Sequence, residues 1–222
     1  MKKLKFCICF LVCFSIVFCG CKTPNPLFPL VSELRSDVFS GSSENLSLTA
    51  CYGFNETPKL NDAKIGERVY LLQFKLKDKS TDQTSYGIKL DFNGQTYKSD
   101  FKLHPVSHTL SAVIEIDDFN LKSFEVTVTY GSQSEVITLN SKVPENTLNY
   151  TSALDCLYKE QRALIDTYQN DNGDLELEVC ARIIVKKEHA YWYVGLSGKN
   201  GNLKALLIDG ITGETLAIRE IF

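Results

Sequence analysis

Two histidines, His104 and His108, stand four residues apart, a spacing at which side chains can share a metal ion. On a helix, imidazoles at i and i+4 face the same side and can bind one zinc. Here Pro105 follows the first histidine directly and the neighbouring residues alternate like a strand, so the helical geometry is lost. We interpret the pair as a loop at a strand end and expect neither a metal site nor a cofactor.

A group of acidic residues around Gly173 is the second candidate for metal chemistry. Asp171, Asp174 and Glu176 resemble parts of a calcium loop. Such a loop needs acidic or amide ligands at alternating positions before its glycine, and Tyr168 would occupy the first of them. The pattern instead indicates a hairpin turn.

Candidate catalytic groups are isolated from one another in this sequence. Asp117 and Asp118 are adjacent, and neighbouring residues of a strand point to opposite faces, which prevents them from acting as a pair. Cys156 and His189 could form a nucleophile and base, but no third group orients them and no oxyanion hole is indicated. We therefore predict no catalytic residues.

The aromatic run at residues 191–193 is the best candidate for binding. Alternation places Trp192 with Val194 on one face of a strand and both tyrosines on the other. We expect Trp192 to pack in a core. Tyr191 and Tyr193 form the candidate interaction surface, because exposed aromatic side chains are common in interfaces.

The first 21 residues have the organisation of an export signal. Residues 1–5 are basic, and residues 6–20 form an uncharged apolar run that is shorter than the roughly 20 residues of a spanning helix. Ending in Val-Phe-Cys-Gly-Cys, the segment resembles a bacterial lipoprotein signal peptide. That resemblance implies that Cys21 is lipidated (with palmitate-type chains) and becomes the mature N-terminus. Phe18 and Cys19 depart from the family pattern, and an ordinary secretory signal is the alternative.

Composition limits the partners of the exported protein. Residues 1–21 carry three lysines and no acids, so their removal changes the formal net charge from -3 to -6. An acidic protein has no electrostatic reason to bind nucleic acid. Membrane attachment is therefore expected through the lipid alone, on the extracytoplasmic face of the bacterial cell membrane.

The three cysteines that remain after Cys21 are Cys51, Cys156 and Cys180. In residues 175–185 the apolar set alternates, so Cys180 points away from the core. Cys156 falls on the flank of the preceding helix. Because these two thiols lie on different sides of the sheet, we predict that they do not form a disulfide.

Residues 22–142 indicate a tether and an all-β domain. Three prolines and a Ser-Gly-Ser-Ser stretch predict a flexible tether at 22–43, with Val38-Phe39 as the start of a short strand. Asn93-Gly94 is a strong type I′ hairpin signal. Residues 44–142 are therefore expected to form an immunoglobulin-like sandwich of seven short strands. These strands lie at 46–50, 70–76, 86–92, 97–101, 112–116, 124–130 and 136–139.

The periodicity changes near residues 143–146, where we place a domain boundary. Thr151-Ser152 and Asp155 resemble a capping box, and apolar residues then follow at helical spacing up to 168. Four alternating runs come next. Residues 146–222 are thus expected to form a small α+β domain with one helix on a four-stranded antiparallel sheet.

The closing strands of this domain resemble a known family. Residues 192–194 (Trp-Tyr-Val), a Gly-Asn turn and residues 209–216 (Asp-Gly-Ile-Thr-Gly-Glu-Thr-Leu) resemble the end of PepSY domains, which have a cystatin-like helix-on-sheet form. The resemblance covers about 150–222 and implies a non-catalytic module that binds or restrains peptidases. The glycine pairs have a purely structural explanation as well, because tight hairpins need residues with positive φ.

Three functional hypotheses follow. The first is a non-enzymatic envelope lipoprotein that presents a protein-interaction or peptidase-regulating module on a β-sandwich stalk. The second is a surface lipoprotein that binds a small ligand between the helix and the sheet of its C-terminal domain. The third, an enzyme, requires polar groups that converge from Asp117 and from the histidines at 104, 108 and 189.

Overall fold

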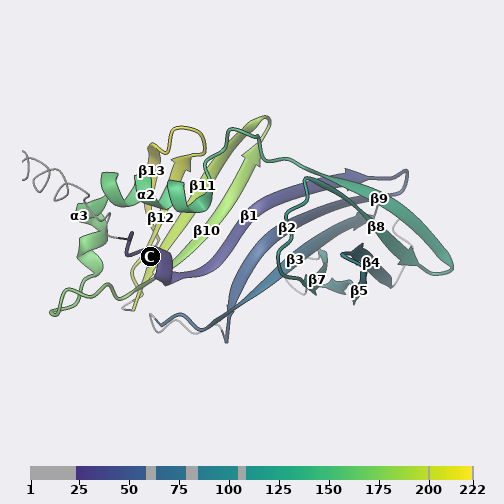
Figure 1. Ribbon diagram of the computed structural model, residues 1–222, viewed down its shortest axis with the longest axis horizontal. Coiled ribbons are helices and arrows are strands. Elements are labelled where there is room, and N and C mark those ends of the chain that lie inside the picture. Colours follow the sequence, from purple (N-terminus) through teal and green to yellow (C-terminus); the bar gives the residue numbers. More distant parts are fainter. Residues whose placement is uncertain (1–23, 59–63, 79–84, 105–108, 200, 222) are drawn as a thin grey trace, which may run out of the picture.

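The computed structural model describes residues 24–58, 64–78, 85–104, 109–199 and 201–221. The proposed lipid site Cys21 and the histidine His108 lie outside these residues. Within them the chain is mostly β, with 60% strand and 12% helix, and the strands join into one sheet (Figure 1).

In the described residues, thirteen strands and two short α-helices follow one another along the chain. The first nine strands are β1 (Val31–Ser42), β2 (Leu46–Thr57), β3 (Glu67–Asp78), β4 (Tyr86–Phe92), β5 (Gln95–Asp100), β6 (Lys102–Leu103), β7 (Leu110–Glu115), β8 (Ser123–Tyr130) and β9 (Gln133–Ser141). They are followed by α2 (Tyr150–Glu160), α3 (Arg162–Ile165), β10 (Leu177–Lys186), β11 (His189–Gly198), β12 (Leu203–Asp209) and β13 (Thr215–Ile221).

Strand β1 organises the whole sheet because it has three partners. It pairs with β2 along most of its length, with β10 in parallel through residues 31–35, and with β9 near its end. A bulge between Arg35 and Asp37 separates the last two pairings. The bulge also shifts the alternation of side chains, so that Leu34 and Phe39 both face buried cores.

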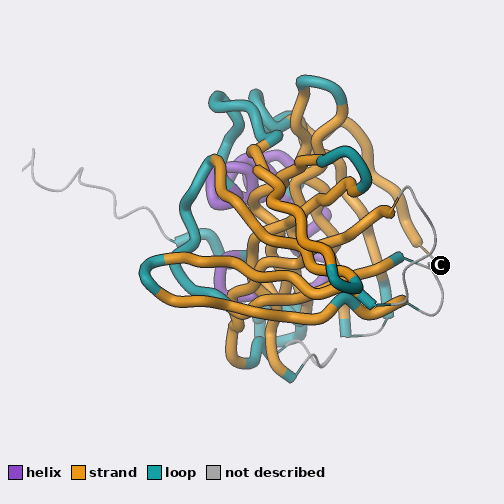
Figure 2. The backbone as a smooth tube through the Cα atoms, turned by 90° about the vertical axis from the view of Figure 1, so that its right-hand side faces the viewer, coloured by secondary structure: helices purple, strands orange, loops and turns teal. Residues whose placement is uncertain are grey.

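The strands β1 to β9 curl into a nearly closed, barrel-like arrangement. On one side of β1 the order is β2, β3, β7 and β6, and on the other side it is β9, β8, β4 and β5. Figure 2 shows how these strands wrap around an interior. Aromatic rings fill part of that interior, where Phe124 meets Phe39 and Phe119 edge-to-face at centroid distances of 5.1 and 4.8 Å.

A second core lies between α2, α3 and the strands β10 to β13. Leu154, Leu157 and Ile165 are fully buried there, together with Trp192, whose Nε1 donates to the carbonyl oxygen of Leu148 at 2.9 Å. The expected burial of Trp192 is therefore confirmed. The side chain of Asn149 accepts from the backbone N–H of Ser152 and caps α2, in place of the capping box predicted three residues later at Ser152 and Asp155.

The expected fold class is wrong. The chain does not form an immunoglobulin-like sandwich followed by a separate helix-on-sheet, PepSY-like domain, because β1 and β2 join all strands into one sheet of 13. The individual strands were largely foreseen. The hairpin at Asn93-Gly94 is confirmed, with φ angles of 49° and 76°. What sequence reasoning missed is the long-range pairing between β1 and β10.

The expected tether is also wrong for most of its length. Residues 31–42 are β1, and the segment before it is packed on the helix. The side-chain amide of Asn25 donates to the carbonyl oxygen of Leu154 at 2.9 Å and to the carboxylate of Asp155 at 3.0 Å, and Leu27 is fully buried. Polar residues and prolines suggested an irregular segment here, but these long-range contacts hold it in place.

Candidate functional site

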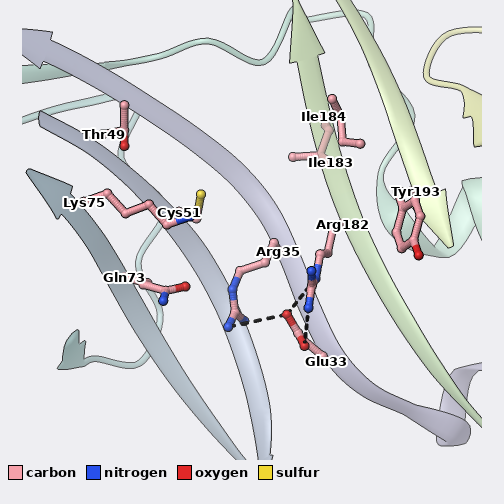
Figure 3. A pocket seen from close by; sticks show the side chains of 10 residues that line it. All are labelled: Glu33, Arg35, Thr49, Cys51, Gln73, Lys75, Arg182, Ile183, Ile184 and Tyr193. Carbon is pink, nitrogen blue, oxygen red and sulfur yellow. Dashed lines mark hydrogen bonds and ion pairs between the residues drawn. The ribbon is translucent and has the colours of Figure 1, made fainter. Parts of the chain in front are cut away.

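An open cleft of about 660 Å³ lies on the face of the sheet opposite both cores. Five neighbouring strands contribute to it, in the order β3, β2, β1, β10 and β11 (Figure 3). Most of its lining residues alternate with core residues, as Cys51 does between buried Ala50 and Tyr52. The lining, which we call the cleft face, comprises Glu33, Arg35, Thr49, Cys51, Gln73, Lys75, Arg182, Ile183, Ile184 and Tyr193.

Glu33 is the centre of the cleft. It is only 5% exposed, and both of its carboxylate oxygens accept hydrogen bonds from Arg182, at 2.8 and 2.9 Å. A second guanidinium, that of Arg35, lies 3.6 Å from the same carboxylate. Paired, two-pronged contacts of this kind are among the stronger side-chain interactions in proteins. Hydrogen bonding to Glu33 accordingly raises the pKa of Arg182 above the ordinary value of 12.5.

Arg35 connects β1 with β2 as well as lining the cleft. Its Nη1 donates to the carbonyl oxygens of Leu34 and Phe54, at 2.8 and 3.1 Å, and its Nη2 donates to the side chain of Asn55 at 3.0 Å. Burial lowers the pKa of Arg35 from 12.5, although an arginine remains protonated in a protein. Arg35 therefore brings a fixed positive charge to the floor of the cleft.

Lys75 on β3 is the fourth charged residue of the cleft face. Its side chain is exposed, and within the described part of the chain no carboxylate lies within ion-pair distance of it. The cleft face thus holds three cations against the single carboxylate of Glu33. On a protein of negative net charge, this cleft is a local region of positive charge.

A smaller hollow of about 400 Å³ continues from the cleft across β10 and β11. The two share Glu33, Arg182 and Tyr193. The hollow adds one more carboxylate, that of the buried Glu178, and the thiol of Cys180.

Among the described residues, Cys51, Cys156 and Cys180 form no disulfide, in agreement with the prediction for Cys156 and Cys180. Cys180 faces the cleft side, whereas Cys156 lies against the turn glycine Gly213 on the helix side. Burial raises the pKa of the Cys51 thiol, which favours its unreactive protonated form.

The two predicted interaction residues have different surroundings. Tyr193 is partly exposed and lines both the cleft and the hollow. Tyr191 is also partly exposed, but its ring packs against that of His189 at a centroid distance of 4.7 Å. His189 in turn contacts the carboxylate of Asp209 at 2.8 Å. Only Tyr193 is therefore part of the charged cleft.

The other chemical candidates remain apart. His104 donates its backbone N–H to Thr109, as a strand-end loop would. Asp174 belongs to a turn in which the side chain of Asn170 accepts from two backbone N–H groups. Among the described residues, no three histidine, cysteine, aspartate or glutamate side chains are grouped so that they could hold a metal ion.

A pocket between the helix and the sheet was the basis of the small-ligand hypothesis. Most of that interface is filled by the buried side chains of Leu154, Leu157 and Trp192. The hollow that remains at its edge, of about 430 Å³, is lined chiefly by the connector 143–150. The larger cleft lies on the opposite face.

Sequence reasoning missed Glu33 and Arg35 because they fell in the expected tether. The available signal was the alternation of these two charged residues with apolar Leu34, which lies between them. That pattern is only a few residues long. The parallel partner that brings Arg182 beside them is 149 residues from Glu33 along the chain. No local pattern reports such a contact.

Comparison with known proteins adds no family to these observations. No protein-family model matches the chain, and no curated protein matches it in sequence. Of the helices that the structure describes, none is long and apolar enough to cross a membrane.

Proposed function

We propose that this protein is a non-enzymatic lipoprotein of the bacterial cell envelope that binds a partner protein through its cleft face. The observation that carries the proposal is the cleft itself, which combines an exposed aliphatic residue, a tyrosine and three cations on one uncovered side of the sheet. Tyrosine and arginine are enriched in protein interfaces. A peptidase of the envelope is one partner class that suits this proposal.

The cleft has the properties of a binding surface. Its strongest charges, Glu33 and Arg182, are already paired and held in place on neighbouring strands. The one thiol at its centre, Cys51, is kept protonated by burial. Such groups present a rigid, preorganised surface, which lowers the entropic cost of binding.

The N-terminal segment supports a close attachment to the membrane. Asn25 is bonded to α2, and Cys21 precedes it by only four residues. Four residues of extended chain span at most about 14 Å. If Cys21 carries the lipid, the α2 side of the fold lies next to the bilayer, with no long spacer between them.

Replacement of the lipidated residue tests the anchor. In cells fed a labelled fatty acid, we expect Cys21→Ser to abolish labelling of the protein and to release it from the membrane fraction, because the lipid is its proposed attachment. Cys51→Ser is the matched control and should retain both. Labelling and membrane retention that survive Cys21→Ser would refute the anchor.

Site-specific photo-cross-linking tests the binding face. A photoreactive amino acid introduced at Tyr193 should give a discrete adduct with a second protein in living cells. The same group at Val136, which is 60% exposed on β9 and outside the cleft, should not. Mass spectrometry of the adduct then identifies the partner and shows whether it is a peptidase. Equal or absent adducts at both positions would contradict the proposal.

A further inference from the structure

We infer that the cleft receives an extended, acidic segment of the partner, with a carboxylate beside Lys75 and an apolar side chain against Ile184 and Tyr193. This inference rests on the proposed function and specifies the chemistry of the segment that the cleft binds. Charge, span and the distribution of apolar surface each lead to it.

The charge of the cleft favours an anionic occupant. Arg35 and Arg182 share the carboxylate of Glu33, and Lys75 has no carboxylate partner among the described residues. The cleft face therefore carries a surplus of two positive charges, and inclusion of Glu178 from the adjoining hollow still leaves one. Because the exported chain is negative as a whole, an acidic segment is attracted here and repelled elsewhere.

The span of the cleft favours a stretch of chain over a small acid. Lys75 lies on β3 and Tyr193 on β11, and these strands are four steps apart in the sheet. At about 4.8 Å for each step, the path between them is roughly 19 Å. About six residues of extended polypeptide cover that path at about 3.3 Å each. A small dicarboxylic acid would reach only one end.

The apolar surface lies at the end of the cleft away from Lys75. Ile184 on β10 is 43% exposed, and Tyr193 lies beside it on β11 (Figure 3). Between the two ends lie Thr49 on β2 and the mutually paired charges of Glu33, Arg35 and Arg182 on β1 and β10, whereas Gln73 lies on β3 beside Lys75. The order across the cleft is thus the unpaired cation of Lys75, then polar and mutually paired charged groups, and then apolar side chains, and the segment should have an acidic, polar and apolar order to match.

Fluorescence anisotropy with a synthetic peptide tests this order directly. The probe is Glu-Glu-Ser-Thr-Ser-Leu-Leu with an N-terminal fluorescein and a C-terminal amide, added to the full chain in a non-ionic detergent. We expect saturable binding at low salt that weakens at least tenfold when sodium chloride is raised to about 0.5 M. The peptide with two glutamines in place of the glutamates should bind at least tenfold more weakly.

Two charge-matched variants locate the binding. Lys75→Glu should lower the affinity for the acidic peptide at least tenfold, and Lys75→Gln should lower it less. Lys98→Glu, on exposed β5 outside the cleft, should leave binding unchanged within twofold. Both positions are exposed, so circular dichroism should show an intact fold for all three variants.

The protein's own cysteines provide an independent footprint. Bound peptide should slow maleimide labelling of Cys51 and Cys180, which line the cleft and its hollow, as measured for each site by mass spectrometry. Labelling of Cys156, on the helix side, should not change.

Several outcomes would overturn the inference. The glutamine peptide could bind as well as the acidic one, or Lys75→Glu and Lys98→Glu could lose affinity for the acidic peptide equally. The other two outcomes are no binding at millimolar peptide, or binding that leaves both Cys51 and Cys180 unprotected from maleimide. If an adduct forms at Tyr193 in cells while any of these results is found, the cleft binds a partner of different chemistry. Failure of the adduct itself refutes the proposed function instead.

Discussion

Glu33 determines the local electrostatics of the cleft because it is a buried carboxylate shared by two arginines. Its two hydrogen bonds with Arg182 hold β10 beside β1, and the guanidinium of Arg35 lies on its other side. A buried charge of this kind is stable only while its partners remain in place.

We predict that Glu33→Gln lowers the free energy of unfolding by about 2 kcal/mol, because the amide loses two charge-assisted hydrogen bonds. Urea unfolding followed by circular dichroism measures this change. Glu115→Gln, at an exposed position of β7, is the control and should change stability by less than about 0.5 kcal/mol. If both substitutions are equally mild, the buried pair does not hold the strands together.

Asp209 forms a second polar centre at the residue scale. Its Oδ1 accepts from the backbone N–H groups of Thr212 and Ile211, at 2.8 and 2.9 Å, and its Oδ2 contacts His189. Led by the bond from Thr212, these hydrogen bonds outweigh partial burial and lower the pKa of Asp209 from 3.8 to about 2.

This lowered pKa predicts a defined pH dependence. A carboxyl with a lower pKa in the folded state stabilises the fold above pH 3.8, and the stabilisation is lost as the pH falls towards 2. Asp209→Asn keeps an acceptor for the turn but cannot ionise. The gap in unfolding free energy between wild type and this variant should therefore be present at pH 7 and should close between about pH 4 and 2. A gap that does not vary with pH would contradict this assignment.

At the scale of elements, the sequence predicted the local structure much better than the long-range pairing. The hairpin of β4 and β5 could be foreseen because Asn93-Gly94 and the alternating flanks act over a few residues. The helix and the four strands after it were also indicated by their periodicity. Of strand β1, only the short strand starting at Val38-Phe39 was predicted, because the bulge breaks the alternation and the parallel partner β10 is far away in sequence.

The close pairing of β1 and β2 beside the bulge depends on a glycine. A Cβ atom at Gly53 would lie 1.9 Å from the carbonyl oxygen of Leu34, so the two backbones could not approach as they do. We predict that Gly53→Ala destabilises the protein by about 3 kcal/mol or more, measured by thermal unfolding. Gly195→Ala on β11 is the control, since its nearest neighbour would be at an ordinary 3.7 Å. Equal melting temperatures for the two variants would show that the backbones of β1 and β2 do not approach so closely at Gly53.

At the scale of the whole molecule, the candidate site depends on features that no single segment contains. The cleft needs β3, β2, β1, β10 and β11 side by side, and these strands come from both halves of the chain (Figure 1). Sequence reasoning identified Tyr193 as a surface residue of its own strand. It could not place that residue beside Lys75 and Glu33, because the parallel pairing of β1 with β10 was not recognised.

The central claim is that the cleft face is covered by a partner in the cell, and thiol accessibility tests it most directly. In the variants Ile184→Cys and Val136→Cys, the labelling rate of the introduced thiol is compared between native membranes and the detergent-purified protein. Both positions are exposed, but only 184 lies in the cleft. We predict that position 184 reacts at least fivefold more slowly in membranes while position 136 is unchanged. Equal rates at position 184 in the two preparations would contradict the claim.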